Sequence, residues 1–362
     1  MAEHLLSTAV HDTLPGSYVR PEPERPRLAE VVTGARIPVV DLGSPDRGAV
    51  VAAVGDACRS HGFFQVVNHG IHAALVAAVM AAGRVFFRLP PEEKAKLYSD
   101  DPARKIRLST SFNVRKETVH NWRDYLRLHC HPLDEFLPDW PSNPPDFKIR
   151  QRDTLPREKS NRELALALAE DRTRETMGTY CKEVRELGFR LYAAISESLG
   201  LEASYMKEAL GEQEQHMAVN FYPPCPEPEL TYGLPAHTDP NALTILLMDP
   251  DVAGLQVLHA GQWVAVNPQP GALIINIGDQ LQALSNGQYR SVWHRAVVNS
   301  DRERMSVASF LCPCNHVVLG PARKLVTEDT PAVYRNYTYD EYYAKFWSRN
   351  LDQEHCLELF RT

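Results

Sequence analysis

The pattern of apolar and polar positions divides the chain into a mainly helical first part and a β-rich second part. In the first part, the pattern predicts strands at 37–42 and 63–67 and helices at 49–61, 71–89 and 175–199. The strands are short apolar runs, whereas the helices carry apolar residues three and four positions apart, on one face. We therefore expect a mixed, mainly helical N-terminal region.

After residue 215 the chain changes to short apolar runs separated by Pro, Gly and Asn. Strands are predicted at 218–222, 243–248, 255–258, 263–266, 272–277, 291–298 and 305–311. Many short strands with closely spaced turns favour a sandwich or a barrel, and the jelly roll is one such closed arrangement. The last stretch, 337–360, is predicted to be helical.

One stretch, 149–174, differs from its surroundings. Twelve of its 26 positions are Arg, Lys, Asp or Glu and none is aromatic, so we predict an exposed polar insertion. The chain then divides into a mostly flexible N-terminal segment (1–36), an N-terminal region (37–148), the insertion (149–174), a helical connector (175–214), a β-rich core (215–320) and a C-terminal segment with a helix (321–362).

Composition and charge exclude several classes of partner. The 39 basic and 46 acidic residues give a net charge of −7, and no basic run is long enough to bind nucleic acid or an anionic membrane. No apolar run reaches the ~18 residues of a membrane span, and the N-terminus lacks the pattern of a secretory signal. Seven cysteines without a close CxxC pair are typical of reduced thiols. We expect a cytoplasmic, monomeric protein whose partner is a small molecule.

The most informative polar residues are His237, Asp239 and His294, here called the triad. Two imidazoles and one carboxylate are the ligands that hold non-haem Fe(II) and leave positions open for a substrate and O2. Residues two apart in a strand point the same way, so His237 and Asp239 can face one cavity, with His294 reaching it from a strand across the barrel. Because a His-x-Asp pair alone is common by chance, the triad needs support from other residues.

Arg304 and Ser306 give that support. If 292–298 and 304–311 form a hairpin, His294 and Arg304 lie on neighbouring strands, and Arg304 and Ser306 share one face. An inward-facing arginine in a barrel is costly unless an anion meets it, and a guanidinium beside a hydroxyl suits a carboxylate. The alternative is a buried salt bridge from Arg304 to a carboxylate of the protein.

Six motifs in the β-rich part carry a resemblance to a known family. They are Asn220-Phe-Tyr-Pro-Pro-Cys-Pro226, Leu234-Pro-Ala-His-Thr-Asp239, Gly254-Leu-Gln-Val257, Asn276-Ile-Gly-Asp-Gln280, Ser291-Val-Trp-His-Arg295 and Arg304-Met-Ser306. In this order they resemble the signatures of plant 2-oxoglutarate/Fe(II)-dependent dioxygenases, and 37–41 and 62–70 resemble that family's N-terminal region. The match covers nearly everything from residue 37 onwards. Within the family, 121–129, 215–220 and 229–235 are most similar to salicylic acid hydroxylases and flavone synthase I enzymes.

The resemblance implies an α+β fold, with a double-stranded β-helix (jelly roll) core flanked by helices. It also implies that the triad holds Fe(II), that O2 is the oxidant, and that ascorbate is needed to keep the iron reduced. 2-Oxoglutarate would chelate the iron, and its far carboxylate would contact Arg304, Ser306, Tyr222 and Asn220.

Three residues are predicted to contact the substrate. Phe310 lies on the face of Arg304, where its ring could stack on a planar phenol, and Tyr125 and Arg127 are two apart in a predicted strand. Arg127 would then serve a salicylate carboxylate or a flavonoid oxygen. The alternatives are core packing for Phe310 and surface exposure for the other two. Ala218 stands where some flavonoid oxygenases place a basic residue, so their substrate contacts do not all carry over.

These residues leave more than one function open. The leading hypothesis is oxidation of a planar phenolic metabolite, either desaturation of a flavanone to a flavone or hydroxylation of salicylic acid. A non-catalytic small-molecule-binding member of the same fold would have lost part of the triad or of the Arg-x-Ser pair, and all five residues are present. A zinc hydrolase using the same ligands would lack a general base near the triad and would leave Arg304 and Ser306 without a role.

Overall fold

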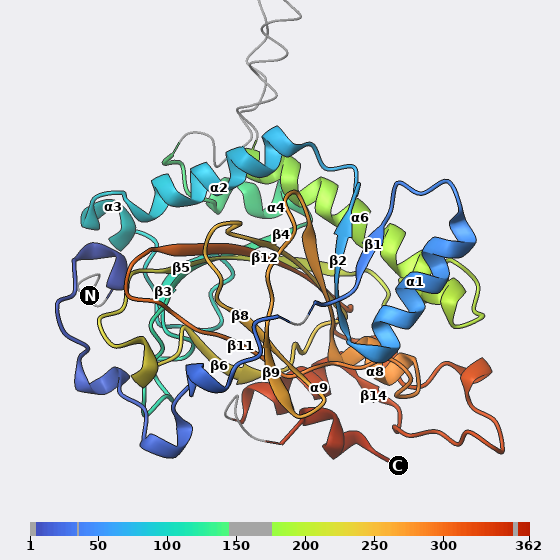
Figure 1. Ribbon diagram of the computed structural model, residues 1–362. Helices are drawn as coiled ribbons and strands as arrows, with labels where there is room; N and C mark the ends of the chain where they lie inside the picture. The colour runs from blue at the N-terminus through green and yellow to red at the C-terminus, as the bar shows by residue number, and fades with distance from the viewer. Residues whose placement is uncertain (1–4, 35, 145–175, 350–353) are drawn as a thin grey trace, which may run out of the picture.

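Two β-sheets form the centre of the molecule, with helices around them (Figure 1). The computed structural model describes residues 5–34, 36–144, 176–349 and 354–362. The predicted α+β class with a jelly-roll core is confirmed. The predicted insertion at 149–174 lies outside the described residues and stays a prediction.

The larger sheet has eight strands in the order β1-β2-β10-β7-β12-β5-β4-β3. Their bounds are β1 (Val39–Asp41), β2 (Phe63–Val67), β3 (Arg107–Thr110), β4 (Asp124–His131), β5 (Glu214–Tyr222), β7 (Leu243–Met248), β10 (Leu273–Ile277) and β12 (Arg304–Cys312). The smaller sheet has the order β6-β11-β8-β9 and consists of β6 (Leu234–His237), β8 (Leu255–His259), β9 (Gln262–Ala265) and β11 (His294–Ala296). A separate pair is formed by β13 (Val318–Leu319) and β14 (Tyr337–Thr338).

Helices cover the larger sheet and one end of the molecule. In Figure 1, α2 and α6 cross above the strands of the larger sheet, and α8 and α9 lie on the opposite side. The α-helices are α1 (Arg47–Ser60), α2 (Ala73–Phe87), α3 (Pro91–Ala95), α4 (Leu133–Phe136), α6 (Thr176–Ser198), α7 (Tyr205–Ala209), α8 (Asp279–Leu284) and α9 (Tyr339–Trp347). Short 3-10 turns include η6 (Leu137–Asp139), η8 (Pro228–Leu230), η9 (Arg323–Leu325) and η10 (Cys356–Phe360).

Strand β12 shows why the larger sheet has one face that packs on helices and one that serves the site. Met305 and Leu311 are buried against the helices, where Gly83 of α2 and Gly188 of α6 leave no room for a side chain beside them. Because successive residues of a strand point to opposite faces, the alternate residues, beginning with Arg304, point towards the interior between the sheets. This confirms the prediction that Arg304 shares one face of the strand with every second residue that follows it.

The predicted hairpin of 292–298 and 304–311 is wrong. Strand β11 pairs with β6 and β8 in the smaller sheet, whereas β12 pairs with β5 and β7 in the larger one. Alternation of apolar and polar residues decides which face a strand buries, but it does not choose the strand's partner. Both edges of β12 are occupied by other strands, so the chain passes from one sheet to the other before β12. His294 and Arg304 therefore lie on different sheets.

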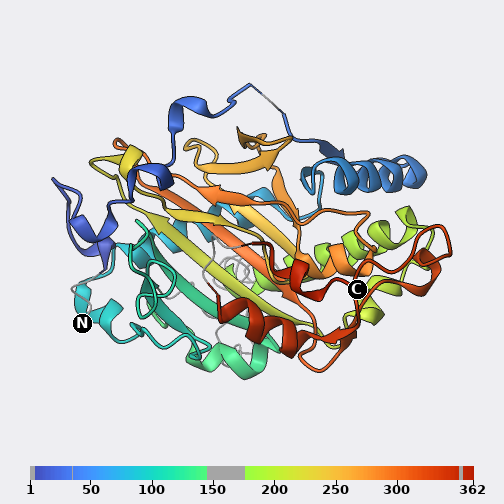
Figure 2. The ribbon, with the colours of Figure 1, turned by 90° about the horizontal axis from the view of Figure 1, so that it is seen from below.

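The N-terminal segment (1–36), expected to be mostly flexible, is packed against the domain along its described part (Figure 2). Leu6 and Tyr18 are buried, and the backbone N–H groups of Leu6 and Ser7 donate to the Asp124 carboxylate at 3.1 and 2.7 Å. Its regular structure is confined to the 3-10 turns η2 (Leu6–Thr8), η3 (Gly16–Tyr18), η4 (Glu22–Glu24) and η5 (Leu28–Glu30). A composition rich in proline and charge disfavours long helices, but it does not prevent a few apolar side chains from anchoring an irregular segment.

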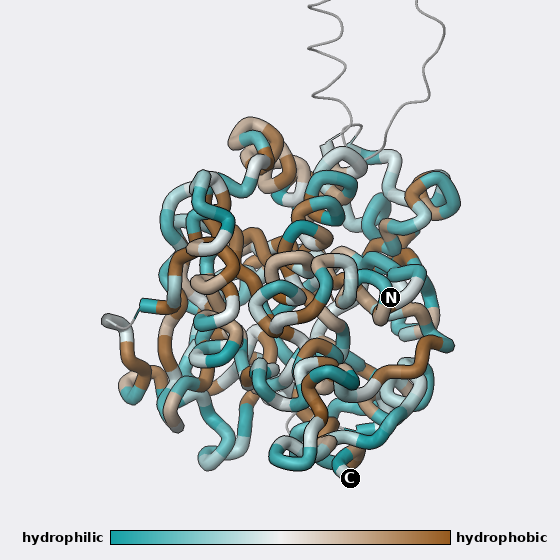
Figure 3. The backbone as a smooth tube through the Cα atoms, turned by 90° about the vertical axis from the view of Figure 1, so that its right-hand side faces the viewer, coloured by the Kyte–Doolittle hydropathy of each residue, from teal (hydrophilic) through white to brown (hydrophobic). Residues whose placement is uncertain are grey.

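The C-terminal segment is less helical than the prediction for 337–360. Strand β14 precedes α9, which begins where the Thr338 hydroxyl accepts a hydrogen bond from the Glu341 backbone N–H, and η10 follows near the end of the chain. Figure 3 shows apolar and polar stretches alternating along the elements, with many outer turns polar. Among the described residues, no helix is both long and apolar enough to span a bilayer. The expected monomeric state and cytoplasmic location stay predictions.

Candidate active site

The three triad side chains meet at one point. Asp239 Oδ1 lies 3.8 Å from His237 Nε2 and 3.6 Å from His294 Nε2, and all three residues are buried. His237 and His294 are direct cross-strand partners on β6 and β11, so His294 comes from the neighbouring strand and not from across the barrel. Asp239 lies two residues beyond the last residue of β6, in the loop that follows. A single strand pairing therefore brings together residues that are far apart in sequence.

Hydrogen bonds orient each triad donor towards the shared point. His237 Nδ1 lies 2.8 Å from the Pro235 carbonyl oxygen and His294 Nδ1 lies 3.1 Å from that of Val292. A carbonyl can only accept, so each Nδ1 carries the proton and each Nε2 presents a lone pair. Burial lowers the pKa of His237 well below its usual value, which keeps the ring neutral.

The second carboxylate oxygen of Asp239 is held by other side chains. Thr244 Oγ1 donates to Oδ2 at 2.6 Å, and the Asn276 side-chain amide donates to the same oxygen. This leaves Oδ1 directed at the two histidines. Two neutral imidazoles and one carboxylate, with donor atoms within 4.8 Å of one another, fit the ligand set of non-haem Fe(II).

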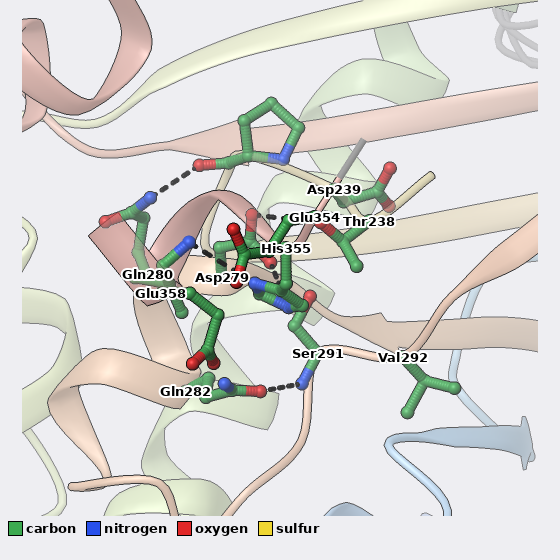
Figure 4. Close-up of polar contacts among 12 residues, drawn as sticks. Thr238, Asp239, Asp279, Gln280, Gln282, Ser291, Val292, Glu354, His355 and Glu358 are labelled. Carbon is green, nitrogen blue, oxygen red and sulfur yellow. Dashed lines mark hydrogen bonds and ion pairs between the residues drawn. The ribbon is translucent and has the colours of Figure 1, made fainter. Parts of the chain in front are cut away.

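A buried carboxylate that the sequence reasoning missed supports the loop 237–239, here called the metal loop. Asp279 accepts a hydrogen bond from Thr238 Oγ1 at 3.2 Å, and its backbone N–H donates to the Asp239 carbonyl oxygen at 2.9 Å. The Tyr342 hydroxyl also donates to the Asp279 carboxylate. His355 Nε2 lies 3.4 Å from this carboxylate (Figure 4). Burial raises the pKa of Asp279, whereas His355 lowers it. The C-terminal segment is thereby connected to the metal loop.

Arg304 is a buried cation without a charged partner among the residues that the structure describes. It is 2 % exposed, and neither its Nε nor its Nη1 has a hydrogen-bond partner among the described residues. Its guanidinium lies 4.9 Å from the centre of the Tyr222 ring. Among the described residues, Arg304 forms no salt bridge with a carboxylate, which was the alternative that the sequence left open. Since an unpaired buried charge is costly, the site fits a ligand that brings an anion, as 2-oxoglutarate does.

The other residues expected to contact 2-oxoglutarate adjoin Arg304. On the paired strands β12 and β5, Arg304 lies opposite Tyr222 and Ser306 lies opposite Asn220. The Asn220 side-chain amide donates to the Ser306 hydroxyl at 3.4 Å, and all four residues are buried. Two cross-strand pairs on the same face therefore bring these four side chains into one patch.

A cavity adjoins the triad. His237 and Asp239 line it together with Phe310, Tyr125 and Arg127, so all three residues expected to contact a substrate reach the same space. Surface exposure of Tyr125, one of the alternatives from the sequence, is excluded because the side chain is buried.

Two further arginines line this cavity, and the sequence reasoning missed both. Arg123 donates to the Ser111 carbonyl oxygen at 3.1 and 2.7 Å, and its guanidinium lies 4.5 Å from the centre of the Tyr125 ring. Arg107 donates to the Tyr125 hydroxyl. Among the described residues, neither they nor Arg127 have a carboxylate within 4.0 Å. Alternation was a usable signal, because it places positions 125 and 127 of β4 on one face, with position 123, the residue just before β4, in line with them.

One wall of the cavity is aromatic. Phe112 stacks on Trp347, with ring centres 4.9 Å apart and planes 8° from parallel. The remaining aromatic rings on this wall come from α9: Tyr339, Tyr343 and Phe346. Nothing in the local sequence pattern of a C-terminal helix indicates that it reaches the site, so these residues were also missed.

Comparisons with known proteins agree on one family. A family model described as "2OG-Fe(II) oxygenase superfamily" matches residues 213–313, and one described as "non-haem dioxygenase in morphine synthesis N-terminal" matches residues 37–147. The chain is 79% identical to "Flavanone 3-dioxygenase 2" of Oryza sativa subsp. japonica, over 99% of this chain and 97% of the relative. It is 57% identical to "Protein DOWNY MILDEW RESISTANCE 6" of Arabidopsis thaliana, over 99% of both. The crystal structure of JOX2 with 2OG, Fe and JA superposes with a TM-score of 0.82 at 35% identity, covering 99% of this chain and 96% of that one.

Proposed function

Because the chain belongs to the 2-oxoglutarate/Fe(II)-dependent oxygenase family and is an oxidoreductase of that class, we propose that it hydroxylates a planar phenolic carboxylate of the salicylate class. The observation that supports this substrate is the cavity beside the triad, which is lined both by aromatic rings and by three arginines that have no carboxylate partner among the described residues. The arginines suit an anion, and the rings suit a flat apolar body.

In this proposal the triad holds Fe(II), and a patch on β12 and β5 holds the far carboxylate of 2-oxoglutarate: Arg304, Ser306, Tyr222 and Asn220. When bound, Fe(II) with 2-oxoglutarate and O2 supplies the oxidising chemistry, and ascorbate would keep the metal ferrous. The chain's own residues bind and orient the reactants. The backbone carbonyls behind His237 and His294 set the direction of the imidazoles, and the aromatic wall keeps water from the substrate.

Arg127 and Arg123 are the proposed anchors for the substrate carboxylate. Phe310 and the Phe112–Trp347 pair would contact the ring of the substrate. A charge-assisted hydrogen bond to such an anion contributes about 1.5–3 kcal/mol. Loss of one of these two arginines should therefore weaken the binding of an anionic substrate more than the binding of a neutral one.

Oxidation of a flavanone is a second candidate, either to a flavone or by hydroxylation. The relative named "Flavanone 3-dioxygenase 2", at 79% identity, favours it, and hydroxylated flavanones such as naringenin also carry flat phenolic rings. The same arginines would then contact phenolic or carbonyl oxygens instead of a carboxylate. The other hypotheses lose support, because a non-catalytic protein needs no intact triad and a zinc hydrolase leaves Arg304 without a ligand.

The two candidates are separated by measuring succinate formation with Fe(II), 2-oxoglutarate, ascorbate and O2. Salicylate should stimulate succinate release and give a hydroxylated product that mass spectrometry identifies, with naringenin as the flavanone tested in parallel. The Asp239→Ala variant is the matched negative control, since it removes a metal ligand. Stimulation by naringenin but not by salicylate would replace the first candidate with the second, and stimulation by neither would overturn both.

A further inference from the structure

Next to Arg127, three side chains form a cluster that has the composition of a metal site. His129 and His216 are cross-strand partners on β4 and β5, and their rings stack with centres 4.0 Å apart. Glu214 Oε2 lies 3.0 Å from His216 Nε2. The cluster reaches the substrate cavity, because Arg127 and His216 both line it.

The surroundings of this cluster argue against a metal ion. Arg127 Nη2 lies 3.2 Å from His129 Nε2 and so occupies the lone pair that a metal would need. The ammonium of Lys105 adds a second positive charge nearby. Glu214, the carboxylate of the cluster, is already bonded to His216. A divalent cation would therefore meet two positive charges and a single carboxylate that is already hydrogen-bonded.

The contact between Arg127 and His129 defines the protonation state of the histidine. A guanidinium only donates hydrogen bonds, so His129 Nε2 accepts and the ring is neutral. Burial, followed by His216 and Arg127, lowers the pKa of His129 to about 2. The other contact of the guanidinium, at 3.2 Å, is with the carbonyl oxygen of Pro102, which is also uncharged.

This arrangement differs from that of other arginines in the chain. Arg84 pairs with Asp249 at 2.6 Å and Arg115 pairs with Asp100 at 2.7 Å, so their charges are neutralised within the protein. Arg127 is held by two neutral acceptors, which fix its position without cancelling its charge. A cation that is held in this way beside a cavity can bind the anionic group of a ligand.

We propose that His129 is a positioning residue for substrate selection: as a neutral acceptor it fixes Arg127 at the cavity and leaves the guanidinium charge free for the carboxylate of the substrate. This inference rests on the proposed function. The charge state of the acceptor, rather than its mere presence, then decides the preference for an anionic substrate.

A pair of substitutions tests the charge directly. His129→Gln keeps a neutral acceptor at a similar reach, whereas His129→Glu places a carboxylate there and neutralises Arg127. We measure KM for salicylate and the inhibition constant of salicylamide, which has the same shape without the charge. His129→Glu should raise KM for salicylate about tenfold or more and change the salicylamide constant by less than about threefold. His129→Gln should change both values by less than about threefold.

Further measurements exclude a purely structural effect. Both variants should melt close to the wild-type temperature, and in an Arg127→Gln background the additional effect of His129→Glu on salicylate should disappear. Equal KM values for His129→Gln and His129→Glu would overturn the proposal. So would a Zn²⁺ ion that binds to the Asp239→Ala variant and is lost when His216→Ala is added. If salicylate proves not to be a substrate, its inhibition constant replaces KM. In that case the proposed substrate is wrong, but the role of His129 is still tested. If salicylate does not bind at all, both the proposed substrate and the proposed role of His129 are overturned.

Discussion

Replacing Tyr342 with phenylalanine removes a single hydroxyl from the cluster that supports the metal loop. Tyr342 is fully buried on α9, and its hydroxyl donates to the carboxylate of Asp279, which is also fully buried. The aromatic ring and its packing are retained, so the substitution isolates one hydrogen bond. Because Asp279 also binds Thr238, between two of the triad residues, the same change should loosen the metal loop.

The expected loss in the free energy of unfolding is about 1.5–3 kcal/mol, the net contribution of a hydrogen bond to a charged group. Asp279 keeps Thr238 and His355 nearby, so its carboxylate is not left without partners and the loss should stay within this range. Tyr337→Phe is the matched control. Tyr337 is 2 % exposed and also donates, at 2.8 Å, but to the neutral amide oxygen of Gln280. Its loss should be about 0.5–1.5 kcal/mol.

Both variants and the wild-type protein are unfolded in urea at about pH 8 with a chelator present, and the slopes of the transitions are compared before the free energies. Calorimetric titration with Mn²⁺ then reports on the metal loop. Tyr342→Phe should weaken Mn²⁺ binding by a larger factor than Tyr337→Phe. If Tyr337→Phe costs as much stability as Tyr342→Phe, Asp279 does not act as a charged centre of the cluster and the reasoning is refuted.

Three other perturbations follow from the structure. Arg304→Gln should raise KM for 2-oxoglutarate by roughly 10- to 100-fold, yet leave the unliganded protein at least as stable, because it removes an unpaired buried charge; a large drop in melting temperature without ligand would contradict this. Asp124→Asn should cost about 1.5–3 kcal/mol and expose the N-terminal segment to limited proteolysis, since the carboxylate accepts from Leu6 and Ser7. The unfolded chain binds a proton at His129 below its usual pKa of 6.5, whereas the folded protein does so only near 2, so stability is lost as the pH falls through 6.5. His129→Gln should reduce the loss between about pH 7.5 and 5.5 by about 1.4 kcal/mol, and an unchanged pH profile in urea unfolding would refute it.

The sequence by itself was sufficient to predict which residues share a strand face and which motifs they form. Alternation in a strand places residues two apart on one face, and this rule alone assigns Arg304, Ser306 and Phe310 to one shared face. The same rule applied to β4 predicts that Tyr125 and Arg127 share a face, and extended by one residue before β4 it also places Arg123 there. The resemblance of six motifs identifies the family, because ligand types and their order along the chain are written in the sequence.

Strand partners were not predictable in this way. The hairpin that would have joined His294 to Arg304 does not exist, since β11 and β12 belong to different sheets. Apolar alternation describes how a strand meets the core, and it is satisfied equally well by several partners. The pairing of His237 with His294 depends on which edges remain free once the other strands have assembled.

Long-range polar contacts were decided by the tertiary structure alone. Asp279 contacts Thr238 and Tyr342, which lie 41 and 63 positions away in sequence, and Asp124 contacts Leu6 across 118 positions. Hydrogen bonds between such distant groups depend on where the sheets and helices bring the backbone, and no local pattern of residue types specifies them. The sequence therefore determined which groups are chemically able to hold a metal and an anion, whereas packing decided which of them meet.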